Sequence, residues 1–371
     1  MSLSSLAKTE ITLSRLSRRP SPSNGRPGRR ARRSSHDPRR VAGLDIQPGE
    51  VIAAQVHLDG GIVVDRAVAG DLDPGLVRDG EVADPTALGE RLRDFFAEHD
   101  LPRTVRVGAP SKRAVMRVID LPPMTDRGDV AAAVRLQAAD YIAMPLDAAV
   151  VDHQVVGTVS TPDGPRTRAV VVAVQRESIR RLLDAVRHAG LRPVGADLAA
   201  FALTRATLRP ADGDPPAVLH VHVAGVTTLA IARGSTCELT RVSAIDLEQL
   251  SRRLASREGN DVAEARTRLL AFGGEGDDAA LAVLDAGLAD LADDLGKTIA
   301  FHAAEAAGPP VAEVRLSGPV ALIPNFPDVL AERLGTPVRV AAPAASPSYA
   351  DELPLERVAM AAGLAVEEVP A

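Results

Sequence analysis

The chain has 371 residues, enough for two domains that each bury a hydrophobic core. With no Trp and only 2% aromatic residues it lacks the stacking platforms of single-stranded nucleic-acid binders, so we expect no nucleic-acid partner. Its one cysteine, Cys237, excludes an internal disulfide, fits a reducing compartment and is expected to be buried on a strand. No apolar run reaches the ~18 residues of a transmembrane helix and no secretory signal is evident, which predicts a cytoplasmic protein.

Charge divides the chain into two parts. Residues 1–40 hold eleven Lys and Arg against Glu10 and Asp37, a balance of +9, which leaves −15 for residues 41–371 given the total of −6. The first segment is rich in Ser, Pro, Gly and Arg, a composition that predicts a disordered basic tail. Such a tail is a solvated extension or a contact for anionic lipid or nucleic acid, and we favour the solvated extension.

The first half of the chain has the pattern of an α/β domain that carries an insertion. A β-meander at 41–69 precedes a helix at 85–98 and a strand at 104–108. Residues 113–197 then change character and predict an α+β subdomain with the order β-α-β-β-α-β. The chain rejoins the first domain near 199–207.

Within the insertion, Pro122 and Pro123 end the first strand and a helix follows at 126–143. The spacing of apolar residues in this helix predicts one inward face. We expect that face to be formed by Val130, Val134, Leu136 and Tyr141.

The second half predicts another α/β domain after a boundary at 212–216 that is rich in Asp and Pro. A second β-meander covers 217–242. Helices are expected at 247–256, 262–270, 279–307 and 327–334, and strands at 314–319 and 338–340. A final helix at 355–365 would return to the first domain.

One local pattern occurs twice. Gly43–Ala54 and Val221–Ile231 each read as a strand, a tight turn and a second strand, and each continues through a glycine turn into a third apolar run. Asp45 in the first copy corresponds to His222 in the second. A hairpin repeated in two halves is how actin-like folds hold a nucleotide, with one turn from each domain around the phosphates.

Further motifs follow in a fixed order. The most specific are Leu121-Pro122-Pro123-Met124, Tyr141-Ile142-Ala143-Met144-Pro145, Asp152-His153-Gln154, Leu316-Ser317-Gly318 and Ala362-Gly363-Leu364. In these stretches residues 41–366 resemble the PilM family of type IV pilus assembly proteins, actin-like relatives of the division protein FtsA.

The resemblance implies an α/β, actin-like (ribonuclease H-like) two-domain fold with an inserted α+β subdomain. The expected parts are a tail at 1–40, a first domain at 41–112 and 198–212, the insertion at 113–197, a second domain at 217–345, and a C-terminal helix and tail at 350–371.

An actin-like nucleotide site needs glycine-bearing turns that approach phosphate and a carboxylate that holds hydrated Mg²⁺. Asp45 is placed for the carboxylate, but Gln47 and Pro48 stand where the family has Gly followed by Ser or Thr. Pro48 has no amide N–H to donate to phosphate. In the second turn His222 is a poor ligand for Mg²⁺ and Ala224 narrows the turn. We therefore interpret the site as degenerate.

Other positions weaken the site in the same way. Asp246-Leu247 and Gly318-Pro319 replace two expected Gly-Gly pairs. If ATP and Mg²⁺ bind, the resemblance gives as candidates Asp45 (which would also hold Mg²⁺ through water), Gly225, Thr227, Thr228 and Gly318. Three of these candidates also have a purely structural interpretation. Asp45 could be a turn residue that caps its own backbone, and Thr227 and Thr228 could simply be strand-forming residues. We assign no catalytic residue.

The resemblance implies an adaptor of pilus assembly that is recruited to the inner face of the cell membrane. It would bind the N-terminal peptide of a PilN-like inner-membrane protein in a groove beside the insertion, and link it to the pilus assembly ATPase. The candidates for this groove are the apolar residues beside the Pro-bounded turns: Leu121, Met124, Tyr141, Ile142 and Met144. The same residues could instead form the core of the inserted subdomain.

Two alternatives remain. An active actin-like ATPase would need turns that tolerate the substitutions. An FtsA-like filament is disfavoured because no amphipathic membrane helix follows Gly363. His220 and His222 have metal-like spacing on one strand face, but no third ligand is evident, and we interpret them as hydrogen-bonded or solvent-facing.

Overall fold

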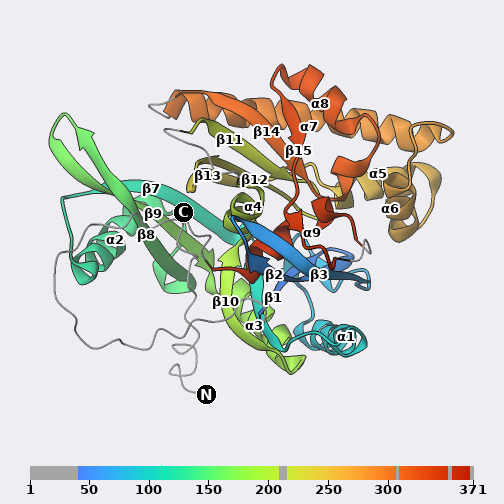
Figure 1. Cartoon of the computed structure of the whole chain (residues 1–371), viewed down its shortest axis with the longest axis horizontal. Coiled ribbons are helices and arrows are strands. Elements are labelled where there is room, and N and C mark those ends of the chain that lie inside the picture. The colour runs from blue at the N-terminus through green and yellow to red at the C-terminus, as the bar shows by residue number, and fades with distance from the viewer. Residues whose placement is uncertain (1–40, 110, 209–214, 306–308, 350–352, 368–371) are drawn as a thin grey trace.

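Three of the four β-sheets in the described residues organise the fold, and the fourth is a two-stranded hairpin (Figure 1). The computed structural model describes residues 41–109, 111–208, 215–305, 309–349 and 353–367. The expected basic tail at 1–40 and the Asp-Gly-Asp boundary at 212–214 lie outside these ranges.

The first sheet has the strand order β10-β6-β1-β2-β3-β16. The expected meander forms its centre, with β1 (Ala42–Gln47), β2 (Glu50–Leu58) and β3 (Ile62–Asp71) antiparallel. The flanking strands β6 (Thr104–Ala109), β10 (Arg192–Leu198) and β16 (Ala344–Ala345) run parallel to their neighbours in this sheet. Helices α1 (Pro85–Glu98) and α3 (Arg176–His188) share its core cluster. A short hairpin precedes α1, formed by β4 (Val77–Arg78) and β5 (Glu81–Val82).

The second sheet has the order β13-β12-β11-β14-β15. Its strands are β11 (Ala217–His222), β12 (Thr227–Arg233), β13 (Thr236–Ser243), β14 (Val311–Ser317) and β15 (Val338–Val340). The helices that share its core are α5 (Leu247–Glu258), α6 (Val262–Leu270), α7 (Asp278–Glu305) and α8 (Phe326–Leu334). Cys237 is buried on β13, as expected.

Two helices lie between the sheets, α4 (Ala199–Thr207) and α9 (Leu355–Ala365) (Figure 1). Helix α9 packs on β2 and β3 through Val358, Ala361 and Ala362, so the end of the chain lies against the first sheet. Glycines let the backbones approach closely: a Cβ on Gly363 would lie 1.9 Å from Ala202 O, and one on Gly43 would lie 1.9 Å from Ala361 O.

Two buried arginines close the C-terminal end of α9. Arg205 donates to Gly363 O at 2.9 Å and pairs with Asp197, and both side chains are buried. Arg106 reaches Leu364 O at 3.4 Å. These donors satisfy carbonyls that a helix end leaves without partners.

The inserted sheet has three strands in the order β7-β9-β8. They are β7 (Ala114–Leu121), β8 (Ala149–Thr161) and β9 (Gly164–Gln175), and α2 (Arg127–Tyr141) packs on one face. Short 3₁₀ turns, η3 (Ser111–Arg113) and η4 (Leu146–Ala148), precede β7 and β8. Strand β10 pairs with β6, and α3 shares the core of the first sheet, so the expected insertion at 113–197 is too long at its C-terminal end.

The orientation expected for α2 is partly wrong. Val130 and Val134 are buried together with Ala138, at intervals of four residues. Leu136 is 79% exposed because it lies on the opposite side of this helix, and Tyr141 is 52% exposed because it is the last helical residue. None of the helices within the described ranges is long and apolar enough to span a membrane.

We expect Gly363→Ala to lower the free energy of unfolding by roughly 1–3 kcal/mol or more, because the new methyl group would force α9 away from α4. Chemical denaturation measures this loss. The control is Gly273→Ala, where no atom lies within 4 Å of the added Cβ, and its effect should stay within about 0.5 kcal/mol. Equal effects of the two substitutions would contradict the close approach.

Candidate functional site

The turns of the two repeated hairpins meet between the first and second sheets, at what we call the hairpin junction (residues 47–50 and 223–226). Gly49 has φ 78°, the left-handed conformation that the tight β1–β2 turn requires. In the opposite turn, a Cβ on Gly225 would lie 2.8 Å from Pro48 Cδ and 2.9 Å from Pro48 O. The two turns are therefore in direct contact.

Gln47 connects the two hairpins by hydrogen bonds. Its Nε2 donates to Asp45 Oδ1 at 2.9 Å within the first sheet. Its Oε1 accepts from the backbone N–H of Val226 at 2.9 Å across the junction. Because Gln47 and Val226 are both buried, this pair of bonds, the Gln47 bridge, is shielded from competing water.

Arg266 on α6 makes a second link across the junction. Its Nη1 donates to Pro48 O at 3.0 Å, and its Nη2 lies 3.7 Å from Glu50 Oε2. Glu50 also pairs with Arg357, which stands at the start of α9. The carboxylate of Glu50 is thus held by cations from two other elements, and the first hairpin turn is fixed to α6.

Asp45 is buried beneath this contact. Burial is the main reason that the pKa of its carboxyl group is raised to about 7. The hydrogen bond from Gln47 lowers this pKa, and the nearby charge of Glu50 raises it. Oδ1 accepts from Gln47, while Oδ2 has no hydrogen-bond partner within the described part of the chain. Near neutral pH the group therefore exchanges between a neutral and a charged form.

The two histidines of the second hairpin are hydrogen-bonded to hydroxyl groups. His222 Nδ1 lies 2.9 Å from Ser317 Oγ, and His220 Nδ1 lies 2.6 Å from Thr207 Oγ1. Burial lowers the pKa of His222 to about 4 and that of His220 to about 3, so both rings are neutral at pH 7. In the described ranges no three His, Cys, Asp or Glu side chains gather as metal ligands.

The other nucleotide candidates are packed into the protein. Thr227 and Thr228 lie on β12 and are buried. Gly318, with φ 91°, lies against the second turn, where a Cβ would approach Val223 O to 2.4 Å, and Pro319 opens η5 (Pro319–Leu322). Asp246 caps α5 by accepting from Gln249 N at 2.8 Å, and burial raises its pKa to about 6.

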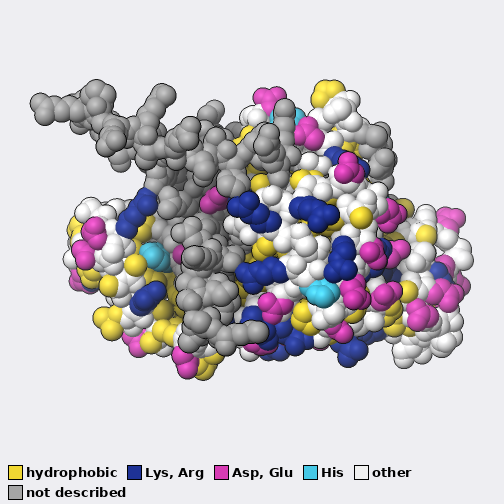
Figure 2. Space-filling view, turned by 90° about the horizontal axis from the view of Figure 1, so that it is seen from below, with side chains coloured by type: hydrophobic (Ala, Val, Ile, Leu, Met, Phe, Trp, Pro, Cys, Tyr) yellow, Lys and Arg dark blue, Asp and Glu magenta, His cyan; other side chains and the backbone are white. Residues whose placement is uncertain are grey.

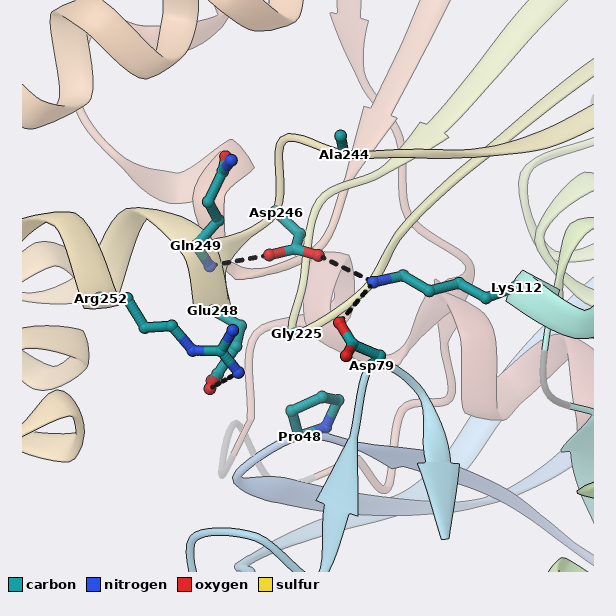
Figure 3. Close-up of a pocket in the computed structure, with 9 residues that line it drawn as sticks. All are labelled: Pro48, Asp79, Lys112, Gly225, Ala244, Asp246, Glu248, Gln249 and Arg252. Atoms are coloured by element: carbon teal, nitrogen blue, oxygen red, sulfur yellow. Dashed lines mark hydrogen bonds and ion pairs between the residues drawn. The ribbon is translucent and has the colours of Figure 1, made fainter. Parts of the chain in front are cut away.

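A cavity of about 260 Å³ remains beside the junction (Figure 3). Pro48 and Gly225 line it, so Gly225 is the one nucleotide candidate from the sequence that faces it. Lys112 crosses its mouth, 3.1 Å from Asp79 and 3.8 Å from Asp246. The volume falls below the ~300–1,000 Å³ typical of small-molecule pockets, and its charges are already paired with one another.

The five candidates for partner binding fall into two groups. Leu121 and Ile142 are buried in the core between α2 and the inserted sheet. Met124 and Met144 pack at the edge of that core, and Tyr141 is exposed. Met124 is held in place because its N–H donates to Thr167 Oγ1 at 3.0 Å.

Sequence reasoning identified Gln47 and Pro48 as obstacles to phosphate but missed that they contact the other hairpin. It also did not foresee the bond from Arg266 to the Pro48 carbonyl. The sequence did carry a signal for these contacts. Gln47 and Arg266 are long polar side chains in segments that come from the two domains on either side of the expected nucleotide cleft. The roles of Lys112 and Asp79 had no sequence signal.

Comparisons with known proteins identify the family. The model for the type IV pilus assembly protein PilM matches residues 43–368. The chain belongs to the PilM family. A solved PilM–PilN type IV pilus biogenesis complex is similar with a TM-score of 0.74 and 21% identity, over 88% of this chain and 97% of that chain.

Weaker similarities to other solved structures are also found. The ethanolamine utilization protein EutJ from Carboxydothermus hydrogenoformans has a TM-score of 0.53 and 14% identity, over 87% of this chain and 88% of that chain. MreB5 of Spiroplasma citri bound to ADP has a TM-score of 0.48 and 12% identity, over 87% and 94%. The fold is the expected actin-like α/β fold.

Asp45→Asn tests the electrostatics of the junction. The pKa of Asp45 has the ordinary aspartate value of 3.8 in the unfolded chain and is about 7 in the folded protein, so the folded state binds the proton more tightly. The resulting stabilisation is complete below about pH 4 and is lost as the pH rises to about 7. Between these pH values the free energy of unfolding should fall by at most about 1.4 kcal/mol per pH unit. The asparagine variant should not show this pH-dependent fall. Denaturant unfolding from pH 4 to 8 measures the difference.

The control for this measurement is Asp163→Asn, which changes an exposed acid in the turn between β8 and β9. Its stability should follow that of the wild type at every pH. If Asp45→Asn keeps the wild-type pH dependence, Asp45 is ionised in the folded protein across this range and the electrostatic account is wrong.

Proposed function

We propose that this PilM-family protein is a binding adaptor of type IV pilus assembly whose two halves are held together by its own side chains rather than by a nucleotide. The observation that carries the proposal is the Gln47 bridge. In an actin-like fold the two hairpin turns flank the nucleotide phosphates, and here Gln47 joins these turns directly.

Three further features support the same conclusion. Pro48 and Gly225 are in van der Waals contact, so no phosphate fits between the turns without separating them. Arg266 occupies the side of the junction next to the Pro48 carbonyl. The remaining cavity is small, and its two cations, Lys112 and Arg252, already pair with its three acids, so no free positive charge is left for a polyphosphate.

Isothermal titration calorimetry with Mg-ATP tests this part of the proposal. We expect no binding heat at millimolar ATP for the wild type, because binding would first have to break the Gln47 bridge and the Arg266 contact. Micromolar binding that Asp45→Ala abolishes would establish the alternative, an active actin-like ATP-binding protein with Asp45 at its metal.

The partner that fits the proposal is a PilN-like inner-membrane protein, because the similar solved complex contains PilM and PilN. We place its cytoplasmic N-terminal peptide along Met124, Tyr141 and Met144, the candidates that are not enclosed in the core of the inserted sheet. Tyrosine and methionine side chains that are not enclosed in a core are typical anchors at binding surfaces. The adaptor would then link the membrane protein to the assembly ATPase at the inner face of the membrane.

The peptide site is tested with a synthetic N-terminal peptide of the organism's PilN-like protein and fluorescence anisotropy. The double variant Tyr141→Ala/Met144→Ala should bind at least about tenfold more weakly, because it removes the central contacts. Leu281→Ala removes an equally exposed side chain on α7 and should leave affinity unchanged. Equal losses in the two variants, or none, would place the peptide elsewhere.

A further inference from the structure

The small β4–β5 hairpin touches the second hairpin turn as well as the first sheet. Val77 and Val82 anchor it in the core of the first sheet. Its turn, Asp79-Gly80, has φ values of 53° and 77°, the left-handed pair that a tight two-residue turn requires. A Cβ on Gly80 would lie 3.1 Å from Val226 Cγ2, so the backbone of this turn lies against the hairpin junction.

The turn η3, which leads into the inserted sheet and which we call the stem, holds this hairpin at two points. Lys112 Nζ donates to Asp79 Oδ1 at 3.1 Å. Arg113 pairs with Glu81 on β5. Because an isolated two-stranded hairpin is at best marginally stable in water, the position of β4–β5 depends on such neighbours.

Lys112 also reaches the side of the second sheet. Figure 3 shows its ammonium group between the carboxylates of Asp79 and Asp246, and it lies 3.8 Å from Asp246 Oδ2. Asp246 caps α5, and the first residue of that helix, Leu247, donates its N–H to Ala224 O at 2.9 Å. The stem therefore reaches the second hairpin turn by two routes, through β4–β5 and through the start of α5.

The two ion pairs of Lys112 differ in their surroundings. The Asp79 side chain is 72% exposed, so its pair contributes little, whereas the Asp246 side chain is only 7% exposed. Burial raises the pKa of Asp246, and the positive charges of Lys112 and Arg252 lower it. Arg252 already pairs with Glu248 at 3.0 Å, which leaves Lys112 as the cation that another element supplies to Asp246.

From these contacts we infer that β4–β5 is a relay that couples the stem of the inserted sheet to the hairpin junction. Lys112 meets both of its acids only while the stem, the β4–β5 turn and the start of α5 stay together. Displacement of the stem would separate Lys112 from Asp246, withdraw Gly80 from Val226 and loosen the second hairpin turn. A load on the inserted sheet and closure of the junction are then thermodynamically linked in both directions. The relay rests on the Gln47 bridge of the proposed function as the closing contact.

Amide exchange of the full-length protein, without nucleotide or partner, tests the relay. Lys112→Met removes the charge and keeps an unbranched side chain. We expect exchange of the Val226 amide to become at least about threefold faster, because Asp246 loses a cation and the start of α5 is held less firmly. Asp79→Asn removes only the exposed pair and suits the left-handed turn, so its effect should be smaller.

The reverse direction has its own reporter. The Ala83 amide donates to Leu76 O at 2.8 Å at the base of β4–β5. Because coupling is reciprocal, Gln47→Ala should speed the exchange of this amide, although Gln47 makes no printed bond to the β4–β5 hairpin in the described residues.

Exposed ion pairs as such are common in this protein, and Figure 2 shows basic and acidic side chains interspersed over one face of the molecule. Lys297→Met is therefore the matched control, since Lys297 pairs with Asp293 at 2.6 Å within α7 and both side chains are exposed. It should leave the Val226 and Ala83 amides unchanged.

Two results would overturn the relay. One is an unchanged Val226 amide in Lys112→Met. The other is equal acceleration at Val226 and at the amides of β14, which would mean that the substitution only lowers global stability. Neither result depends on whether Mg-ATP binds, so the relay and the proposed function can fail separately.

Discussion

The hydrogen bond from the Val226 amide to the Gln47 carbonyl oxygen joins the two halves of the molecule at the point where an actin-like protein holds its nucleotide. Gln47 can make this bond because Asp45 fixes its amide group on the other side. Pro48 and Gly225 then fit against each other without a side chain between them. If this contact were absent, the two sheets would be joined mainly by α4 and α9.

Those two helices explain why one contact at the turns can have a large effect. Helices α4 and α9 lie between the sheets and approach each other closely through small residues, so they hold the two sheets at a fixed spacing. The Gln47 bridge and Arg266 add direct contacts at the turns, so the two sheets are joined at the junction as well as through these helices.

Much of the fold could be predicted from the sequence. The repeated hairpins, the long Ala-rich helix and the returning C-terminal helix follow from periodicity and from glycine turns, and the family follows from ordered motifs. The orientation of Leu136 could not be predicted, because α2 has apolar residues on both sides and periodicity alone does not say which side is buried. The cross-junction contacts of Gln47 and Arg266 also could not, since they join residues about 180 and 220 positions apart in the chain.

Hydrogen exchange at the backbone of residues 223–226, read by mass spectrometry or NMR with and without Mg-ATP, distinguishes a junction closed by Gln47 from one closed by a nucleotide. If the Gln47 bridge closes the junction, the Val226 amide is strongly protected in the nucleotide-free protein and Mg-ATP does not change its exchange rate. Rapid exchange without nucleotide, followed by protection when Mg-ATP is added, would show that a nucleotide closes the junction and would contradict the account.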